Sequence, residues 1–216
     1  MGLELSTGRS FEVGSELGPE FFRERCHVVA ESLVGKLLVN EVDGVAGVIV
    51  ETEAYMGEDD PACHLSNGDT ERNQVFFKGP GTVYVFVIHG HDNLNFITEH
   101  RGHPGGVLIR AVEPVKEVEK MKKRRGKTGK KLTDGPGKLT EAFNISKKQH
   151  NGQSIDKSPI TVRETSLELE TAKTERIGIS DAEHWELRYI AEENRYVSKN
   201  METKENYSQE VQSYYS

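Results

Sequence analysis

Hydrophobic and polar residues near the start of the chain follow first a helical and then a strand-like pattern. Over residues 19–34, apolar side chains recur at roughly helical spacing, and Gly35 is suited to end a helix. Two runs rich in β-branched residues follow, at 36–40 and 45–53. They flank an Asp-Gly dipeptide at 43–44, which favours a tight turn between antiparallel strands. The pattern therefore predicts a helix followed by a β-hairpin.

Later parts of the chain contain shorter elements of both kinds. Runs of β-forming residues predict strands at residues 83–88, 107–112, 161–169 and 185–190. Residues 114–124 and 139–145 have the patterns of short helices. Because neither an internal repeat nor a domain linker is visible, we expect one mixed α/β (α+β) domain.

The two ends of the chain differ from this central region. Residues 1–16 contain Gly and Ser without periodicity and are expected to form a flexible lead. Residues 17–199 are expected to fold. Residues 200–216 have almost no apolar periodicity, so we expect a disordered tail.

Composition argues against several classes of protein. The longest apolar stretches among the 216 residues, such as 45–50 and 83–88, are far too short to span a membrane. The N-terminus lacks the basic start and apolar core of a secretion signal. Cys26 and Cys63 are too few for a disulfide framework or a thiolate zinc site. We therefore expect an intracellular protein without a membrane segment.

The distribution of charge leaves nucleic-acid binding open. A formal net charge of −7 disfavours it, because phosphates are bound by cations. Residues 120–131, however, contain eight cations and no anion. Such a run is most often a solvated loop, and it could also serve as a nuclear import signal. Alone, it does not establish DNA binding.

Three polar residues alternate at the end of the second hairpin strand. Glu51, Glu53 and Tyr55 should project from one face, since side chains in a strand alternate. An edge strand with charged residues facing water would explain them without any function. The apolar run 48–50 just before them instead indicates a buried strand, and carboxylates emerging from a buried strand are typical of acid–base sites.

A cluster of histidines offers a second candidate site. His89, His91 and Asp92 lie at the end of the predicted strand 83–88, and His64 lies in the preceding loop. Alternate residues could supply metal ligands, but histidines are common at loop ends. The spacing is weak evidence, so a metal-dependent hydrolase stays an alternative, and the leading expectation is no metal and no cofactor.

Several blocks together resemble the alkyladenine (methylpurine) DNA glycosylase family. In order they are LGPEFF at 17–22, VETEAY at 50–55, RN at 72–73, GTVYV at 81–85, VLIRAVEP at 107–114 and GPGKL at 135–139. Each is weak alone, but the combination is specific, and order and spacing match from about residue 17 to about residue 198. The resemblance implies a single compact domain built on a curved, mostly antiparallel sheet with surrounding helices.

The resemblance implies three residues around the attacking water. Glu53 matches the glutamate that holds and deprotonates it, and Arg110 matches an arginine that helps to hold it. The block RIGI at 176–179 places the backbone carbonyl of Ile177 against the same water. Such a carboxylate suits the reaction, because cleavage of a glycosidic bond passes through an oxocarbenium-like state.

A second group of residues is expected to bind the damaged base. Tyr55 and His64 match rings that stack on the flipped base, and Phe86 stands where the family often has Tyr. Asn95 matches an Asn that screens the exocyclic group, although the loop before it is one residue short. Leu108, in the same block as Arg110, is also assigned to the base pocket.

The expected DNA contacts include one departure from the family pattern. His89 stands where the family inserts a Tyr into the gap left by the flipped nucleotide. An imidazole can wedge into a stack, but it buries less area than a Tyr ring. Gly90, His91 and Arg72 are expected beside the DNA. Lys138 lies at a predicted helix start, where a phosphate would be stabilised.

These matches imply a monofunctional glycosylase of base excision repair, acting as a monomer on damaged double-stranded DNA. It would flip an alkylated or deaminated purine out of the duplex and hydrolyse its N-glycosidic bond, leaving an abasic site. No lysine occupies a matched pocket position from which a Schiff base could form. A non-catalytic module that binds DNA lesions or RNA is the other alternative. It has no use for a water-holding carboxylate such as Glu53.

Overall fold

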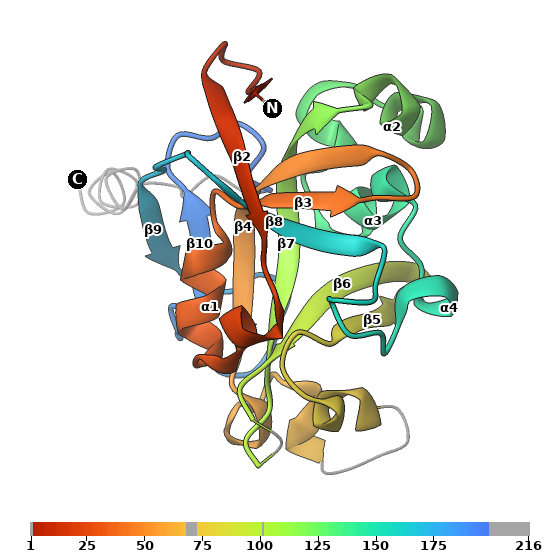
Figure 1. The fold of residues 1–216 in the computed structure, drawn as a ribbon. Helices are drawn as coiled ribbons and strands as arrows, with labels where there is room; N and C mark the ends of the chain where they lie inside the picture. Colours follow the sequence, from red (N-terminus) through yellow and green to blue (C-terminus); the bar gives the residue numbers. More distant parts are fainter. Residues whose placement is uncertain (1, 68–72, 101, 199–216) are drawn as a thin grey trace, which may run out of the picture.

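A long central strand, β4 (Val45–Tyr55), organises the arrangement of the chain. The computed structural model describes residues 2–67, 73–100 and 102–198 (Figure 1). Along one edge β4 pairs with β7 (Gly105–Lys116) over almost its whole length. Along the other edge, β3 (Leu37–Asn40) pairs with the first half of β4 and β10 (Arg188–Ala191) with the second half.

The other strands extend this sheet in both directions. They are β1 (Gly2–Glu4), β2 (Ser10–Glu16), β5 (Val83–Ile88), β6 (His91–Thr98), β8 (Ile160–Thr165) and β9 (Thr171–Thr174). The order across the sheet is β1-β2-β8-β3-β4-β7-β6-β5, with β10 and β9 added beside β4, and every pairing described is antiparallel. The prediction of a mixed α/β fold on a mostly antiparallel sheet is confirmed.

Helices surround the sheet. The α-helices are α1 (Cys26–Leu33), α2 (Val118–Arg125), α3 (Pro136–Phe143) and α4 (Lys147–His150). The 3-10 helices are η1 (Pro19–Arg23), η2 (Gly57–Asp59), η3 (His64–Asn67), η4 (Gln74–Lys78) and η5 (Gly129–Leu132). None of the helices in the described ranges is long and apolar enough to cross a membrane.

Both faces of the central strands are buried. In β4, Ile49 packs in a core cluster with residues of α1 and α3, while Val48 and Val50 pack in a cluster on the opposite face. That second cluster includes Phe11 of β2 and Tyr196, which follows β10. The continuous apolar run in β4 is explained by this burial on two sides. The edge-strand interpretation of Glu51, Glu53 and Tyr55 is therefore wrong.

The start of the chain differs from what its sequence suggested. Where a flexible lead was expected at residues 1–16, the structure has β1 and β2, and β2 pairs with β8. Only Phe11 of β2 is deeply buried, so the strand carries no clear alternation. The tail expected at 200–216 lies outside the described residues.

Helix boundaries also shift. The helix predicted over residues 19–34 is divided into η1 and α1, because Glu24 is extended and the Cys26 N–H is held by Glu99 rather than by a preceding turn. The helix predicted at 114–124 begins only at Val118, since β7 continues to Lys116, which pairs with Ala46. Strand β6 was not predicted at all.

Deletion of the Phe22 ring is expected to lower the free energy of unfolding by about 3–5 kcal/mol, because a large buried ring leaves a cavity. Phe22 is fully buried and packs on Phe96, with ring centroids 5.2 Å apart. The measurement is urea unfolding of Phe22→Ala beside Phe21→Ala, whose ring is only partly buried. Equal losses in the two variants would contradict the prediction.

Candidate active site

A carboxylate and a guanidinium meet beneath the surface where β4 and β7 pair. Glu53 is fully buried, and Arg110 Nη1 donates to its Oε2 at 3.2 Å. The Tyr55 hydroxyl donates to the same oxygen at 2.9 Å. The backbone N–H of Ile177 donates to Oε1 at 2.7 Å, while the Ile177 carbonyl accepts from Arg110 Nη1 at 3.5 Å. Glu53, Arg110 and Ile177, which the sequence assigns to one function, lie together.

A second buried carboxylate lies two residues earlier on β4. Glu51 is fully buried and binds two arginines through Oε1: Arg110 Nε at 3.2 Å and Arg188 Nη1 at 2.8 Å. Ser198 adds its hydroxyl to Oε1 at 2.8 Å and its N–H to Oε2 at 2.7 Å. Arg110 therefore bridges Glu51 and Glu53, and the buried cluster contains two anions and two cations.

Burial and charge act against each other on these groups. Loss of water raises the pKa of Glu53 above its ordinary value, although Arg110, the Ile177 N–H and the Tyr55 hydroxyl each lower it. Burial lowers the pKa of Arg110, but Glu53 and Glu51 outweigh it and raise that pKa above its ordinary value. Arg110 therefore stays a cation, and the Glu53 carboxylate takes up a proton at a higher pH than a free glutamate does.

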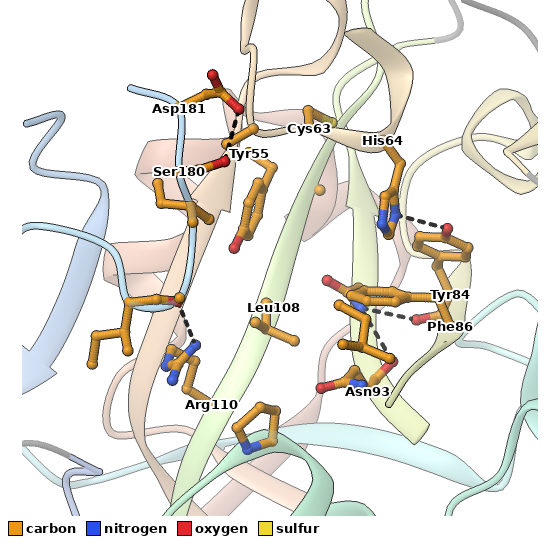
Figure 2. Close-up of a pocket in the computed structure, with 18 of the residues that line it drawn as sticks. Tyr55, Cys63, His64, Tyr84, Phe86, Asn93, Leu108, Arg110, Ser180 and Asp181 are labelled. Carbon is orange, nitrogen blue, oxygen red and sulfur yellow. Dashed lines mark hydrogen bonds between the residues drawn. The ribbon is translucent and has the colours of Figure 1, made fainter. Parts of the chain in front are cut away.

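A cavity of about 520 Å³ opens beside this cluster (Figure 2). Its walls come from alternate positions of neighbouring strands, which share one face. These residues are Tyr55 of β4, Tyr84 and Phe86 of β5, Asn93 and Asn95 of β6, and Gly106, Leu108 and Arg110 of β7. Residues 61–64 and 177–181 form further parts of the wall. Glu53 itself does not line the cavity; it lies behind Tyr55 and Arg110.

Aromatic rings dominate one side of the cavity. The His64 ring is perpendicular to Phe86, with centroids 4.5 Å apart, and its Nδ1 is 3.1 Å from the Tyr84 hydroxyl. Across the space stands Tyr55, whose ring is packed by the guanidinium of Arg176 at 4.8 Å. Arg176 forms two hydrogen bonds to Asp60, at 2.5 and 2.9 Å, and both side chains are fully buried. This ion pair anchors the segment that carries Ile177.

Two amide side chains present acceptors at the cavity wall. The Asn95 Nδ2 group donates to the backbone carbonyls of Tyr84 and Asn93, and the Asn93 Nδ2 group donates to the carbonyl of His91. Because these donors are used by the backbone, the orientation of each amide is determined. The amide oxygens are left to accept hydrogen bonds from a bound molecule.

A smaller groove of about 290 Å³ adjoins the mouth of the cavity. Its walls include His89 and His91 from the β5–β6 hairpin, Lys138 at the start of α3, and Arg125 at the end of α2. The hairpin turns at His89 and Gly90, both with positive φ (49° and 80°), a conformation typical of two-residue turns. The groove thus combines a projecting turn with cationic side chains.

All five residues that the sequence assigned to base binding line the cavity: Tyr55, His64, Phe86, Asn95 and Leu108. Of those assigned to DNA contact, His89, His91 and Lys138 line the groove, Gly90 lies at the hairpin turn, and Arg72 is outside the described residues. Sequence reasoning missed Tyr84, Asn93, Cys63, Ser180 and Asp181. Only Tyr84 and Asn93 carried a signal, because each lies two positions from a residue already chosen.

The proposed metal ligands are not gathered into a site. The Asp92 carboxylate accepts from the Lys147 N–H at 3.0 Å, and the His64 ring packs on Phe86. No group of three His, Cys, Asp or Glu side chains in the described ranges is placed to hold a metal ion.

Comparison with known proteins identifies the family of this chain. Residues 20–195 match the family model described as methylpurine-DNA glycosylase. A protein of Prosthecochloris aestuarii is 47% identical over 190 residues, which cover 83% of this chain and 89% of that protein. Proteins of Listeria monocytogenes (38% over 188 residues; 83% and 90%) and Clostridium perfringens (38% over 204 residues; 85% and 98%) are also similar. All three are named provisionally as 3-methyladenine DNA glycosylases. The chain therefore belongs to the methylpurine-DNA glycosylase family and is a DNA glycosylase, a hydrolase of the N-glycosidic bond.

Proposed function

We propose that this enzyme flips an alkylated or deaminated purine out of double-stranded DNA and hydrolyses its N-glycosidic bond, leaving an abasic site. The observation that carries the proposal is the meeting of Glu53, Arg110 and the Ile177 carbonyl directly behind an aromatic cavity. Hydrolysis of a flipped nucleotide needs an enclosed site for the purine and a proton acceptor beside the sugar. The cavity and the carboxylate supply these two requirements.

The chemical step needs one water and one proton acceptor. Arg110 and Ile177 both line the cavity and both hydrogen-bond to Glu53, so a water that contacts the two from the cavity side lies near Glu53. The water oxygen attacks the anomeric carbon of the sugar and transfers a proton to the Glu53 carboxylate. The bond between that carbon and the purine nitrogen breaks, and its electron pair leaves with the base. A cationic alkylated purine then departs as a neutral molecule.

The cavity is suited to a flat, electron-poor base. Tyr55, Tyr84 and Phe86 present electron-rich rings, which attract a cationic purine by about 1–2 kcal/mol. The amide oxygens of Asn93 and Asn95 place the negative ends of two dipoles at the same wall. Both features favour an alkylated purine over a normal base.

The groove beside the cavity supplies a surface for the duplex. We assign the His89–Gly90 turn to the gap left by the flipped nucleotide, and His91 and Lys138 to the flanking strand. Arg125 belongs to the basic run at 120–131 and also lines the groove. It donates to the carbonyls of Lys131 and Leu132, so it holds the end of the run near the groove. The enzyme is proposed to act as a monomer, since all of these groups belong to one chain, and to work inside the cell, where its DNA substrate lies.

Replacement of the catalytic carboxylate tests the proposal directly. In Glu53→Gln, release of purines from alkylated DNA and from a duplex with one hypoxanthine should fall by about 10²- to 10⁴-fold, the usual contribution of a general base. Lesion binding, measured by fluorescence anisotropy, should persist. Wild-type release should be unaffected by a chelator.

Absence of release from both substrates by the wild-type protein, with lesion binding intact, would identify a binding module instead. Release that depends on metal would contradict the mechanism.

The Tyr55 hydroxyl is expected to control the pH dependence of base release. Glu53 acts as a carboxylate, so the rate falls as the pH drops through its pKa, which burial already holds above the ordinary value. Tyr55→Phe keeps the ring but removes a hydrogen bond that lowers this pKa. The acid limb of the single-turnover rate should therefore move to higher pH. A limb that stays in place or moves to lower pH would refute the assignment.

The basic run is expected to contribute salt-dependent DNA affinity. Lys130 and Lys131 are exposed, and each phosphate contact adds about 0.9 to the slope of log affinity against log salt. The double variant Lys130→Ala/Lys131→Ala should reduce that slope by about 2, whereas Lys157→Ala, an exposed lysine outside the run, should leave it unchanged. Equal effects in the two variants would remove the run from the DNA surface.

A further inference from the structure

Glu51 is a buried acid that the proposed reaction does not use. Its side chain is fully buried, yet it is bound by four donors from three separate parts of the chain: Arg110 of β7, Arg188 of β10, and the hydroxyl and N–H of Ser198. A buried carboxylate is costly unless it is paired and hydrogen-bonded. Its position next to the arginine of the active site indicates what these bonds accomplish.

The contacts of Arg110 divide between two edges of its guanidinium. Nε faces Glu51 at 3.2 Å, while Nη1 faces Glu53 at 3.2 Å and the Ile177 carbonyl at 3.5 Å. A guanidinium is planar, so a partner that holds Nε also determines where Nη1 points. Arg188 and Ser198 in turn hold the Glu51 carboxylate in place.

We propose that Glu51 is a positioning residue: together with Arg188 and Ser198, it holds Arg110 in the orientation that serves Glu53 and the attacking water. The inference rests on the proposed function, because it assigns Arg110 to the water. It also gives Arg188 and Ser198, which do not line the cavity, a part in the active site.

Glu51 has a second effect, through charge. The groups that face Glu53 are Arg110 of β7, Arg176 of the loop before β10, and Tyr55 and Glu51 of β4 itself. Among these groups, the negative charge of Glu51 raises the pKa of Glu53, and Arg110 lowers it. Arg110 lowers the pKa of Glu53 more than Glu51 raises it, so a variant in which Arg110 turns away should have a higher Glu53 pKa and an acid limb at higher pH. A defect of folding alone would not produce this shift.

Glu113 offers a matched control. Like Glu51, Glu113 is a buried carboxylate, 1% exposed, and it connects distant segments. It lies on β7, the neighbour of β4. Its oxygens accept from the N–H and hydroxyl of Ser6 and from Asn194 Nδ2. Among the described residues, the hydrogen bonds of Glu113 go to Ser6 and Asn194 and not to Arg110, so Glu113→Gln disturbs a comparable buried network while leaving the active-site arginine alone.

The experiment compares Glu51→Gln, Glu51→Asp and Glu113→Gln with the wild type, with stability measured for each by urea unfolding. For Glu51→Gln we expect a fall of about 10- to 100-fold in the plateau of single-turnover base release, typical of a misplaced catalytic group. Lesion affinity should stay unchanged, and the acid limb should move to higher pH. Glu51→Asp keeps a carboxylate for Arg110, so its acid limb should shift less and its plateau should fall less. Glu113→Gln should retain the wild-type plateau and limb.

A titration of the Glu53 carboxyl carbon by NMR provides a readout that does not need turnover. A higher Glu53 pKa in Glu51→Gln, with no change in Glu113→Gln, would support the proposal, whereas a lower one would show that Arg110 keeps its place without Glu51. An unchanged pKa and plateau in Glu51→Gln, or equal loss of activity in Glu113→Gln, would overturn it. If the wild type itself releases no base, the proposed function fails, whereas the NMR titration still decides whether Glu51 acts on Glu53.

Discussion

Two neighbouring carboxylates on β4 are buried inside the protein, and the need to pair them with cations determines which side chains the adjoining strands must supply. Glu51 and Glu53 could not both be ionised in the interior without Arg110 and Arg188. Removal of one partner from such a network leaves an uncompensated buried charge, which costs about 3–5 kcal/mol. The arginines come from the two strands that pair with this part of β4. The sheet must therefore be assembled before the cluster can exist.

The same pairing positions the cavity. Because side chains alternate along each strand, one face of β4, β7, β6 and β5 presents a row of residues that ends in the aromatic wall at Tyr84 and Phe86. The opposite wall belongs to the loop after Arg176, which is held by the buried ion pair with Asp60. Rigid strands and one anchored loop thus bring the groups proposed to bind water to the edge of the proposed base pocket. Such preorganisation is what catalysis by positioning requires.

Charged side chains are distributed differently between the interior and the surface of the protein. The net charge of −7 would repel DNA if it were spread evenly. Two of the acidic residues are used inside, against Arg110 and Arg188, whereas exposed cations such as Lys130 and Lys131 lie on the segment that Arg125 ties to the groove. A local basic surface on an acidic protein is sufficient for phosphate contact.

The sequence by itself determined the local elements and the family. The hairpin β3–β4 followed from two β-branched runs around an Asp-Gly turn, and the ordered blocks led to the family that the comparisons confirm. It also singled out Glu53, Arg110 and Ile177, which the structure places in contact, while their roles stay predictions.

The tertiary structure alone decided how distant segments meet. Arg188 and Ser198 lie 137 and 147 residues from Glu51, and neither carries a local signal of that contact. Likewise β2 shows no clear alternation, and β6 went unpredicted although Asn93 and Asn95 alternate with Leu94 and Phe96; the pairing of both strands comes from the strands beside them. Periodicity reports which side of an element is buried, whereas partners across a sheet depend on strand order and register, which only the folded chain specifies.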